Sequence, residues 1–282
     1  MAVAILLLII SAIIVFIGMI ANVSADDGYG SRWYAGAYYS GEPTQSHSIH
    51  SQITVPNSDP RPDEFYYLLT SIDDNAGSYD QIGLVANYGV WGLDYSWTTG
   101  DCANRTFHFD PKAMILQKGA TYDLYMTSNN DGKGFFFEVY QAGQSTSEAP
   151  LWSQFVDNNS TAFEVTGTSL LHCGYRAYTD YEEVWSTHYP NGYPNFNFTF
   201  AKNEYYIEGR GWVPTKWEPY NITSTIPVPP EVHVEIKGNQ VYVYQPYLAS
   251  TPEMPVGILW SMVFVGLMAI VIFARRFRFL SK

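Results

Sequence analysis

The sequence predicts an all-β protein: a double-sheet antiparallel β-sandwich of the jelly-roll type, followed by one C-terminal transmembrane helix. Segments with period-2 alternation of apolar and polar residues recur from residue 48 to residue 244, separated by turns rich in Gly, Asn and Pro. Aromatic residues, which favour strands, make up 17% of the chain. An uncharged apolar stretch near the C-terminus has the length of a membrane span.

That stretch is Val256–Ala274, and it is followed at once by Arg275, Arg276, Arg278 and Lys282. At about 1.5 Å per residue, a helix over this stretch is roughly 28 Å long, close to the thickness of a hydrocarbon core. Basic residues beside a span favour the cytoplasmic side. The sequence therefore predicts a single-pass protein of the cell membrane, with its C-terminus in the cytoplasm and its preceding domain outside.

The N-terminal 25 residues agree with export. The apolar segment Ala2–Ile20 precedes Val23-Ser24-Ala25, a small-residue cleavage pattern ahead of Asp26. This predicts a signal peptide, although the apolar segment is also long enough to remain as an uncleaved anchor. We expect residues 26–247 to form the ectodomain, 248–255 a stalk, 256–274 the span and 275–282 a basic cytoplasmic tail.

The expected strands follow from the alternation and from the turns that end it. Asn129-Asn130-Asp131-Gly132 and Lys237-Gly238-Asn239 are hairpin signals between apolar runs. Pro56 ends one strand, and Asp73-Asp74-Asn75 fits a turn better than a calcium site. The expected strands are 48–55, 65–72, 81–87, 90–97, 106–109, 121–128, 134–140, 162–165, 170–178, 183–186, 195–201, 232–236 and 241–244.

Composition and the absence of known motifs argue against nucleic-acid, metal and cofactor binding. The net charge is −12, and four of the 15 basic residues lie in the expected cytoplasmic tail, so the ectodomain is more acidic still. Nucleic-acid binding requires clustered Lys and Arg, and no nucleic-acid partner is expected. No zinc-ligand spacing, phosphate-cradling Gly loop or G-x-S-x-G motif occurs, and neither a metal nor a cofactor is expected.

The exported part carries further marks of a surface protein. Its two cysteines, Cys102 and Cys173, are expected to form a disulfide in an oxidising compartment. The glycosylation pattern N-x-S/T, typical of exported surface loops, occurs at Asn104, Asn158, Asn159, Asn197 and Asn221.

Several short motifs, in order, resemble the glutamic peptidases of the eqolisin type. The family's T-V-P, G-I-D, Q-T-G and Y-E-W correspond to Thr54-Val55-Pro56, Ser71-Ile72-Asp73, Gln81-Ile82-Gly83 and Tyr95-Ser96-Trp97. A KG-x-T-Y turn and a hairpin follow within His108–Tyr140. The segment Cys173–Val184 is similar to a later family segment. The resemblance covers roughly 130 residues and implies a concanavalin-like double-sheet sandwich, the fold that the strand pattern also predicts.

The family's chemistry uses a Gln amide and a Glu carboxylate across a groove, the Glu as general base and the Gln as oxyanion donor. The resemblance places the Gln at Gln81. Counted from Cys173, the first family Glu falls on Tyr178 and the second on Glu182, and the Glu of Y-E-W is Ser96. A strand slip of two or four positions would put Asp180 or Glu182 opposite Gln81 instead.

Two functions therefore remain open at this stage. One is a membrane-tethered acid endopeptidase acting on unfolded protein or peptides, with Gln81 and either Glu182 or Asp180. The other is a non-catalytic surface module that binds glycan or protein. In both, we expect a concave groove in which Tyr95, Trp97 and Tyr178 join Gln81 and Glu182, a lining suited to a peptide or glycan polymer.

Overall fold

The structure is a computed structural model that describes residues 33–60, 65–87, 89–99, 106–109, 113–165, 177–185, 196–223 and 231–245. The expected signal peptide, stalk, membrane span and tail lie outside these residues, as do Cys102, Cys173 and Asn104. Within the described ranges, no helix is long and apolar enough to cross a membrane.

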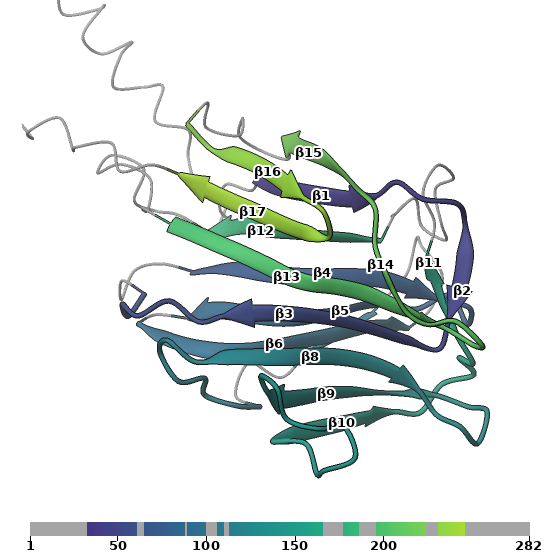
Figure 1. Ribbon diagram of the computed structural model, residues 1–282. Coiled ribbons are helices and arrows are strands. Elements are labelled where there is room, and N and C mark those ends of the chain that lie inside the picture. The colour runs from purple at the N-terminus through teal and green to yellow at the C-terminus, as the bar shows by residue number, and fades with distance from the viewer. Residues whose placement is uncertain are drawn as a thin grey trace, which may run out of the picture.

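The described chain forms two antiparallel sheets, as the alternation predicts (Figure 1). The first sheet has nine strands in the order β15-β1-β12-β4-β5-β6-β7, with β11 paired to β4 and β2 paired to β11. These strands are Trp33–Tyr39 (β1), Thr44–Ser46 (β2), Phe65–Asp74 (β4), Tyr79–Asn87 (β5), Val90–Thr99 (β6), Thr106–Phe109 (β7), Phe163–Val165 (β11), Tyr178–Trp185 (β12) and Trp217–Thr223 (β15).

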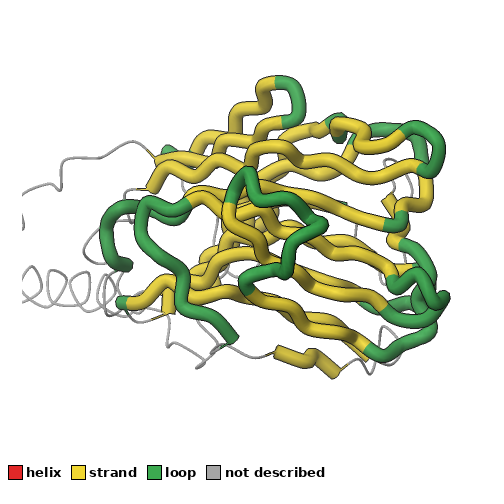
Figure 2. The backbone as a smooth tube through the Cα atoms, turned by 60° about the horizontal axis from the view of Figure 1, so that its bottom comes forward, coloured by secondary structure: helices red, strands yellow, loops and turns green. Residues whose placement is uncertain are grey.

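The second sheet has eight strands in the order β10-β9-β8-β3-β13-β17-β16, with β14 paired to β13. Its strands are Ser48–Thr54 (β3), Thr121–Ser128 (β8), Phe135–Gln141 (β9), Trp152–Val156 (β10), Phe196–Ile207 (β13), Gly211–Pro214 (β14), His233–Lys237 (β16) and Gln240–Gln245 (β17). In the tube view the strands run side by side in layers, with loops at their ends (Figure 2).

The core lies between the sheets and is built from one face of each. Alternation is clearest in β17, whose residues are alternately partly exposed and buried, and in the first half of β13. Phe137 and Phe200 from the second sheet meet Leu84 and Tyr95 from the first in one apolar cluster. Because successive strand residues point to opposite faces, the alternate residues of β4, β5 and β6 must line the outer face of the first sheet.

Both hairpin predictions are confirmed. Asn129–Gly132 joins β8 to β9, with the Asn129 Oδ1 accepting from the Asp131 amide and Gly132 at a φ of +90°. Lys237-Gly238-Asn239 joins β16 to β17, with Gly238 at a φ of +64°. In each turn a glycine adopts the left-handed conformation that the tight reversal requires.

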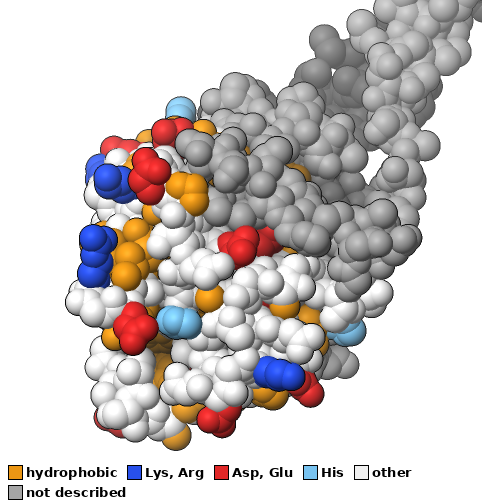
Figure 3. Space-filling view, turned by 90° about the vertical axis from the view of Figure 1, so that its right-hand side faces the viewer, with side chains coloured by type: hydrophobic (Ala, Val, Ile, Leu, Met, Phe, Trp, Pro, Cys, Tyr) orange, Lys and Arg blue, Asp and Glu red, His pale blue; other side chains and the backbone are white. Residues whose placement is uncertain are grey.

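The end of the sandwich formed by such turns carries charges of both signs. Figure 3 views the molecule from that side and shows Lys and Arg side chains next to acidic ones, with apolar patches between them. A mixed surface of this kind favours solubility over recognition of a single charged ligand.

Candidate functional site

One row of residues crosses the outer face of the first sheet and contains Gln81. Ser71 on β4 pairs with Gln81 on β5, and Gln81 pairs with Ser96 on β6. On the other side of β4, Ser71 pairs with Tyr178 on β12. Side chains opposite one another in an antiparallel sheet share a face, so all four belong to one row.

Hydroxyl groups enclose the Gln81 amide. Its Nε2 donates to the Tyr79 hydroxyl at 2.9 Å, and lies 3.2 Å from both the Ser71 Oγ and the Tyr178 hydroxyl. The Ser96 Oγ donates to Gln81 Oε1 at 2.9 Å. The hydroxyls of Tyr79 and Tyr178 are themselves in hydrogen-bond contact.

This cage leaves the amide little capacity for a substrate. A Gln side chain offers two N–H donors, and three hydroxyl oxygens already surround them. Gln81 is only 8% exposed, and all four of its side-chain hydrogen bonds run to hydroxyls. A tyrosine hydroxyl has a pKa near 10, so at acid pH Tyr178 cannot accept the proton that a general base removes from water.

Tyr178 therefore stands in the row where the resemblance places the family's Glu. The strand slip that would replace it does not occur, because Asp180 pairs with Leu69 and Glu182 with Tyr67. In a flat sheet those offsets put the Cα atoms of Asp180 and Glu182 roughly 12 and 16 Å from that of Gln81. Neither position is opposite Gln81, contrary to the expectation for a catalytic carboxylate.

The expected groove residues Tyr95 and Trp97 are on the other face of the sheet. Since Ser96 pairs with Gln81, its neighbours on β6 point into the sandwich. The Tyr95 ring lies 5.4 Å from that of Phe137 and 4.6 Å from that of Trp152. Trp97 stacks on His108 at 4.9 Å. Both are interior packing residues, and the prediction that they line the groove is wrong.

Other tyrosines take their place on the outer face. The pairings of Tyr38 with Tyr178 and with Glu218 put these residues on the face of Gln81. The Tyr220 ring centroid lies 6.0 Å from that of Tyr38 and 5.9 Å from that of Tyr178, and the Tyr79 centroid lies 6.2 Å from that of Tyr178. We call Tyr38, Tyr79, Tyr178 and Tyr220 the tyrosine face.

Sequence reasoning also missed Asp94. It lies two residues before Ser96 on β6 and pairs with Gly83, so it shares the outer face and is a diagonal neighbour of Gln81. It is 2% exposed. The sequence shows that Asp94 and Ser96, two residues apart on one strand, point to the same face. It does not show that this is the face of Gln81, which follows only from the pairing of Ser96 with Gln81.

The expected glycosylation positions are placed unevenly. Asn159 and Asn197 are exposed. Asn158 is partly buried, and its Nδ2, the atom that would carry a glycan, donates to Asp74 Oδ2 at 2.8 Å. Asn221 lies in β15, next to the tyrosine face in sequence.

Comparison with known proteins gives matches to solved structures alone. No protein-family model matches the chain, and no curated protein sequence does. Two crystal structures of Scytalido-glutamic peptidase, one with a peptide-based transition state analog and one with a transition state analog inhibitor, match at 12% and 11% identity. Each has a TM-score of 0.45 and covers 77% of this chain and 99% of that chain.

A third match is the CBM2 module of Lactobacillus casei BL23 phage J-1 evolved Dit, at 12% identity and a TM-score of 0.28, covering 54% of this chain and 77% of that chain. The all-β sandwich is established by the two sheets described above and not by these matches. At such identities and scores they say nothing about chemistry, which rests on the residues described above.

Proposed function

We propose that this chain displays a β-sandwich outside a cell membrane and uses the tyrosine face to bind an extended glycan without cleaving it. The observation that carries the proposal is that the Gln81 amide is fully hydrogen-bonded to neighbouring hydroxyls. Tyr178 occupies the position beside it at which the resemblance would require a general base. The signal-like N-terminus and the basic C-terminal flank support display at the membrane.

The lining of the face favours a sugar polymer. Tyr38, Tyr178 and Tyr220 are partly buried rings in a connected series, and flat aromatic rings with a polar edge suit pyranose stacking. The exposed Glu218 accepts from the Tyr38 hydroxyl at 2.7 Å and adds an acceptor at the rim. A peptide added as a strand at β15 is disfavoured, because Pro219 cannot donate to a new ladder.

Binding is tested with the full chain in uncharged detergent, by titration with soluble oligosaccharides of several linkage types. Tyr220→Ala is expected to weaken binding by about 1–2 kcal/mol, roughly five- to thirtyfold, because it removes one stacking ring. Tyr220→Phe keeps the ring and is expected to retain most of the affinity. The proposal fails if no oligosaccharide binds, or if Tyr220→Ala binds as tightly as the parent chain.

Hydrolysis is tested separately, with an unfolded protein as substrate between about pH 2 and 5, where a carboxylate base would act. We expect no cleavage, and no difference between the parent chain and Gln81→Ala. Cleavage that disappears in Gln81→Ala would establish the peptidase instead.

One observation favours peptidase activity as the second candidate function. The buried carboxyl group of Asp94 is a diagonal neighbour of Gln81 on the same face. If cleavage is found, Asp94→Asn distinguishes a base at this position from one elsewhere. Loss of cleavage in Asp94→Asn with retained binding would assign the role to Asp94.

A further inference from the structure

The outer face of the second sheet carries a separate cluster of rings and carboxylates. Ile49 and Ile53 of β3 point into the core, so His50 and Gln52 between them point outward. The pairings of His50 with Tyr125 and Glu204 bring those residues to the same outer face. None of these residues takes part in the Gln81 row.

The rings form a continuous series. The Tyr140 centroid lies 5.6 Å from that of Tyr125, and His50 stacks on Tyr125 at 4.3 Å with an interplanar angle of 6°. Trp212 of β14 lies 5.7 Å from both His50 and Tyr125, and Tyr206 lies 5.6 Å from Trp212. Trp212 is 40% and Tyr206 is 36% exposed, so the outer end of the series faces solvent.

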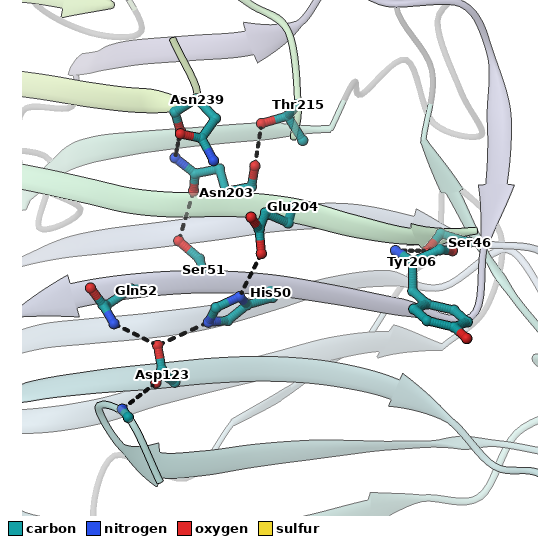
Figure 4. A network of polar contacts seen from close by, with 11 residues as sticks. Ser46, His50, Ser51, Gln52, Asp123, Asn203, Glu204, Tyr206, Thr215 and Asn239 are labelled. Carbon is teal, nitrogen blue, oxygen red and sulfur yellow. Dashed lines mark hydrogen bonds and ion pairs between the residues drawn. The ribbon is translucent and has the colours of Figure 1, made fainter. Parts of the chain in front are cut away.

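Two carboxylates of this face, those of Asp123 and Glu204, contact His50 (Figure 4). Asp123 Oδ1 lies 2.9 Å from His50 Nε2 and accepts from Gln52 at 2.8 Å, and Glu204 Oε2 lies 3.4 Å from His50 Nδ1. Glu138 accepts from the Tyr140 hydroxyl at 3.1 Å. We call Tyr125, Tyr140, Trp212 and Tyr206, with Asp123, Glu138 and Glu204, the acidic–aromatic patch.

The patch is short of positive charge. In the described part of the chain, His50 is the only ion-pair partner of Asp123 and Glu204, and no Lys or Arg pairs with either. One histidine offsets at most one of three carboxylates. Burial raises the pKa of the Tyr125 hydroxyl, and the negative charges of Asp123, Glu204 and Glu138 raise it further, which agrees with a negative potential over the rings.

We propose that the acidic–aromatic patch binds an extended segment of a partner protein that carries arginine or lysine side chains. Aromatic faces attract such cations. The partly exposed Glu138 and Glu204 add hydrogen-bond acceptors and opposite charge, whereas the buried Asp123 adds negative charge alone, because its two oxygens already accept from His50, Gln52 and the Gly143 amide. The rings that a ligand can reach, Tyr125 of β8, Tyr206 of β13 and Trp212 of β14, span more than one small cation needs. Because the tyrosine face is on the opposite sheet, this segment and the proposed glycan bind on different sides of the sandwich.

The probes are decapeptides of alternating Gly and Arg, Gly and Gln, or Gly and Glu, titrated against the full chain in uncharged detergent and followed by isothermal titration calorimetry. Only the Arg peptide is expected to bind, and its affinity is expected to fall as salt rises, because added salt screens the charges. Trp212→Ala and Glu204→Gln are each expected to weaken it roughly tenfold. Glu204→Gln keeps the side-chain shape and an acceptor for His50, so it tests charge rather than folding.

Two control variants show whether binding of the Arg peptide depends on the patch. Glu148→Gln removes the same charge at an exposed site outside the patch, and Tyr220→Ala alters the tyrosine face. Both are expected to bind the Arg peptide like the parent chain. The proposal is overturned if the Arg peptide does not bind, if Glu148→Gln weakens it as much as Glu204→Gln, or if Trp212→Ala reduces oligosaccharide binding instead. Failure of glycan binding alone leaves this result unaffected.

Discussion

Lowering the pH from 7 towards 4 is expected to stabilise the folded protein, and Asp80→Asn is expected to remove most of that gain. Asp80 lies on β5, is 0% exposed, and accepts from the Ser78 Oγ at 2.7 Å through Oδ1. Its Oδ2 has no hydrogen-bond partner in the described residues. Burial raises the pKa of Asp80 well above its usual value of 3.8, and the nearby charges of Asp74 and Asp73 raise it further.

Asp74 acts in the same direction. Burial raises its pKa as well, although hydrogen bonds from the Ser78 and Ala76 amides and from Asn158 oppose the shift. An acid with a raised pKa holds its proton in the folded state at pH values where the unfolded chain has released it. Its stabilising contribution is complete below pH 3.8 and is lost as the pH rises through the folded-state pKa.

The effect is large because each pH unit spent between the two pKa values costs about 1.4 kcal/mol. Asp80→Asn keeps the acceptor for Ser78 and removes the titration. It is therefore expected to raise the free energy of unfolding at pH 7 by about 1–4 kcal/mol and to flatten the pH profile. Denaturant unfolding of the full chain at pH 4, 5, 6 and 7 measures both.

One other substitution serves as a reference, and one native residue shows the opposite behaviour. Asp157→Asn makes the same substitution at an exposed site and controls for the loss of one negative charge. Asp123 behaves in the opposite way: burial opposes its ionisation, but hydrogen bonds from His50, the Gly143 amide and Gln52 outweigh it and lower its pKa. Its stabilisation is lost only as the pH falls below about 3.8, so it does not interfere above pH 4. A profile for Asp80→Asn that runs parallel to that of the parent chain would contradict the prediction.

Local pattern was sufficient for most of the sandwich. Strand-like patterns marked β3, β8, β9 and β17, and two glycine-containing turns predicted the connections from β8 to β9 and from β16 to β17. The local pattern missed β1, β2, β10, β14 and β15. In β10 and β14 the runs are short, and β15 carries Pro219, which is tolerated because β15 ends the sheet order and exposes one edge.

The composition of the site depends on pairing between strands that are distant in sequence, which the local pattern does not predict. Parity within β6 correctly groups Tyr95 with Trp97, but only the pairing of Ser96 with Gln81 shows that this group faces the core. In the same way, β12 alone allows three registers for Tyr178, Asp180 and Glu182. The pairing of Tyr178 with Ser71 selects one of them and puts a phenol beside the amide.

Gly83→Ala is expected to destabilise the sheet at the centre of that register. A Cβ added at Gly83 would lie 1.8 Å from the Leu68 carbonyl oxygen, 2.8 Å from the Leu68 carbonyl carbon and 3.0 Å from the Leu69 Cα. All three are backbone atoms of β4, the neighbouring strand, so no side-chain rotation can relieve the contact. The φ of Gly83 is not positive, and the glycine is therefore required by the close approach of the two strands and not by its backbone conformation.

The strands must move apart to admit the methyl group, at a cost of at least about 1–3 kcal/mol, typical of overpacking. The Ser71–Gln81 pair is the next pair on this face, so the same movement is expected to loosen the hydroxyl cage around the amide. Denaturant unfolding gives the first effect, and faster amide hydrogen exchange in β4 and β5 reports the second.

Gly132→Ala is the matched control, because it adds the same methyl group where nothing lies within 4 Å, at a φ of +90°. Its expected cost is that of the backbone conformation alone, about 1 kcal/mol, with no change of exchange in β4 or β5. If Gly83→Ala were as stable as the parent chain, β4 and β5 would not approach as closely as the structure has them, and the row that unites Tyr178, Ser71, Gln81 and Ser96 would lose its support.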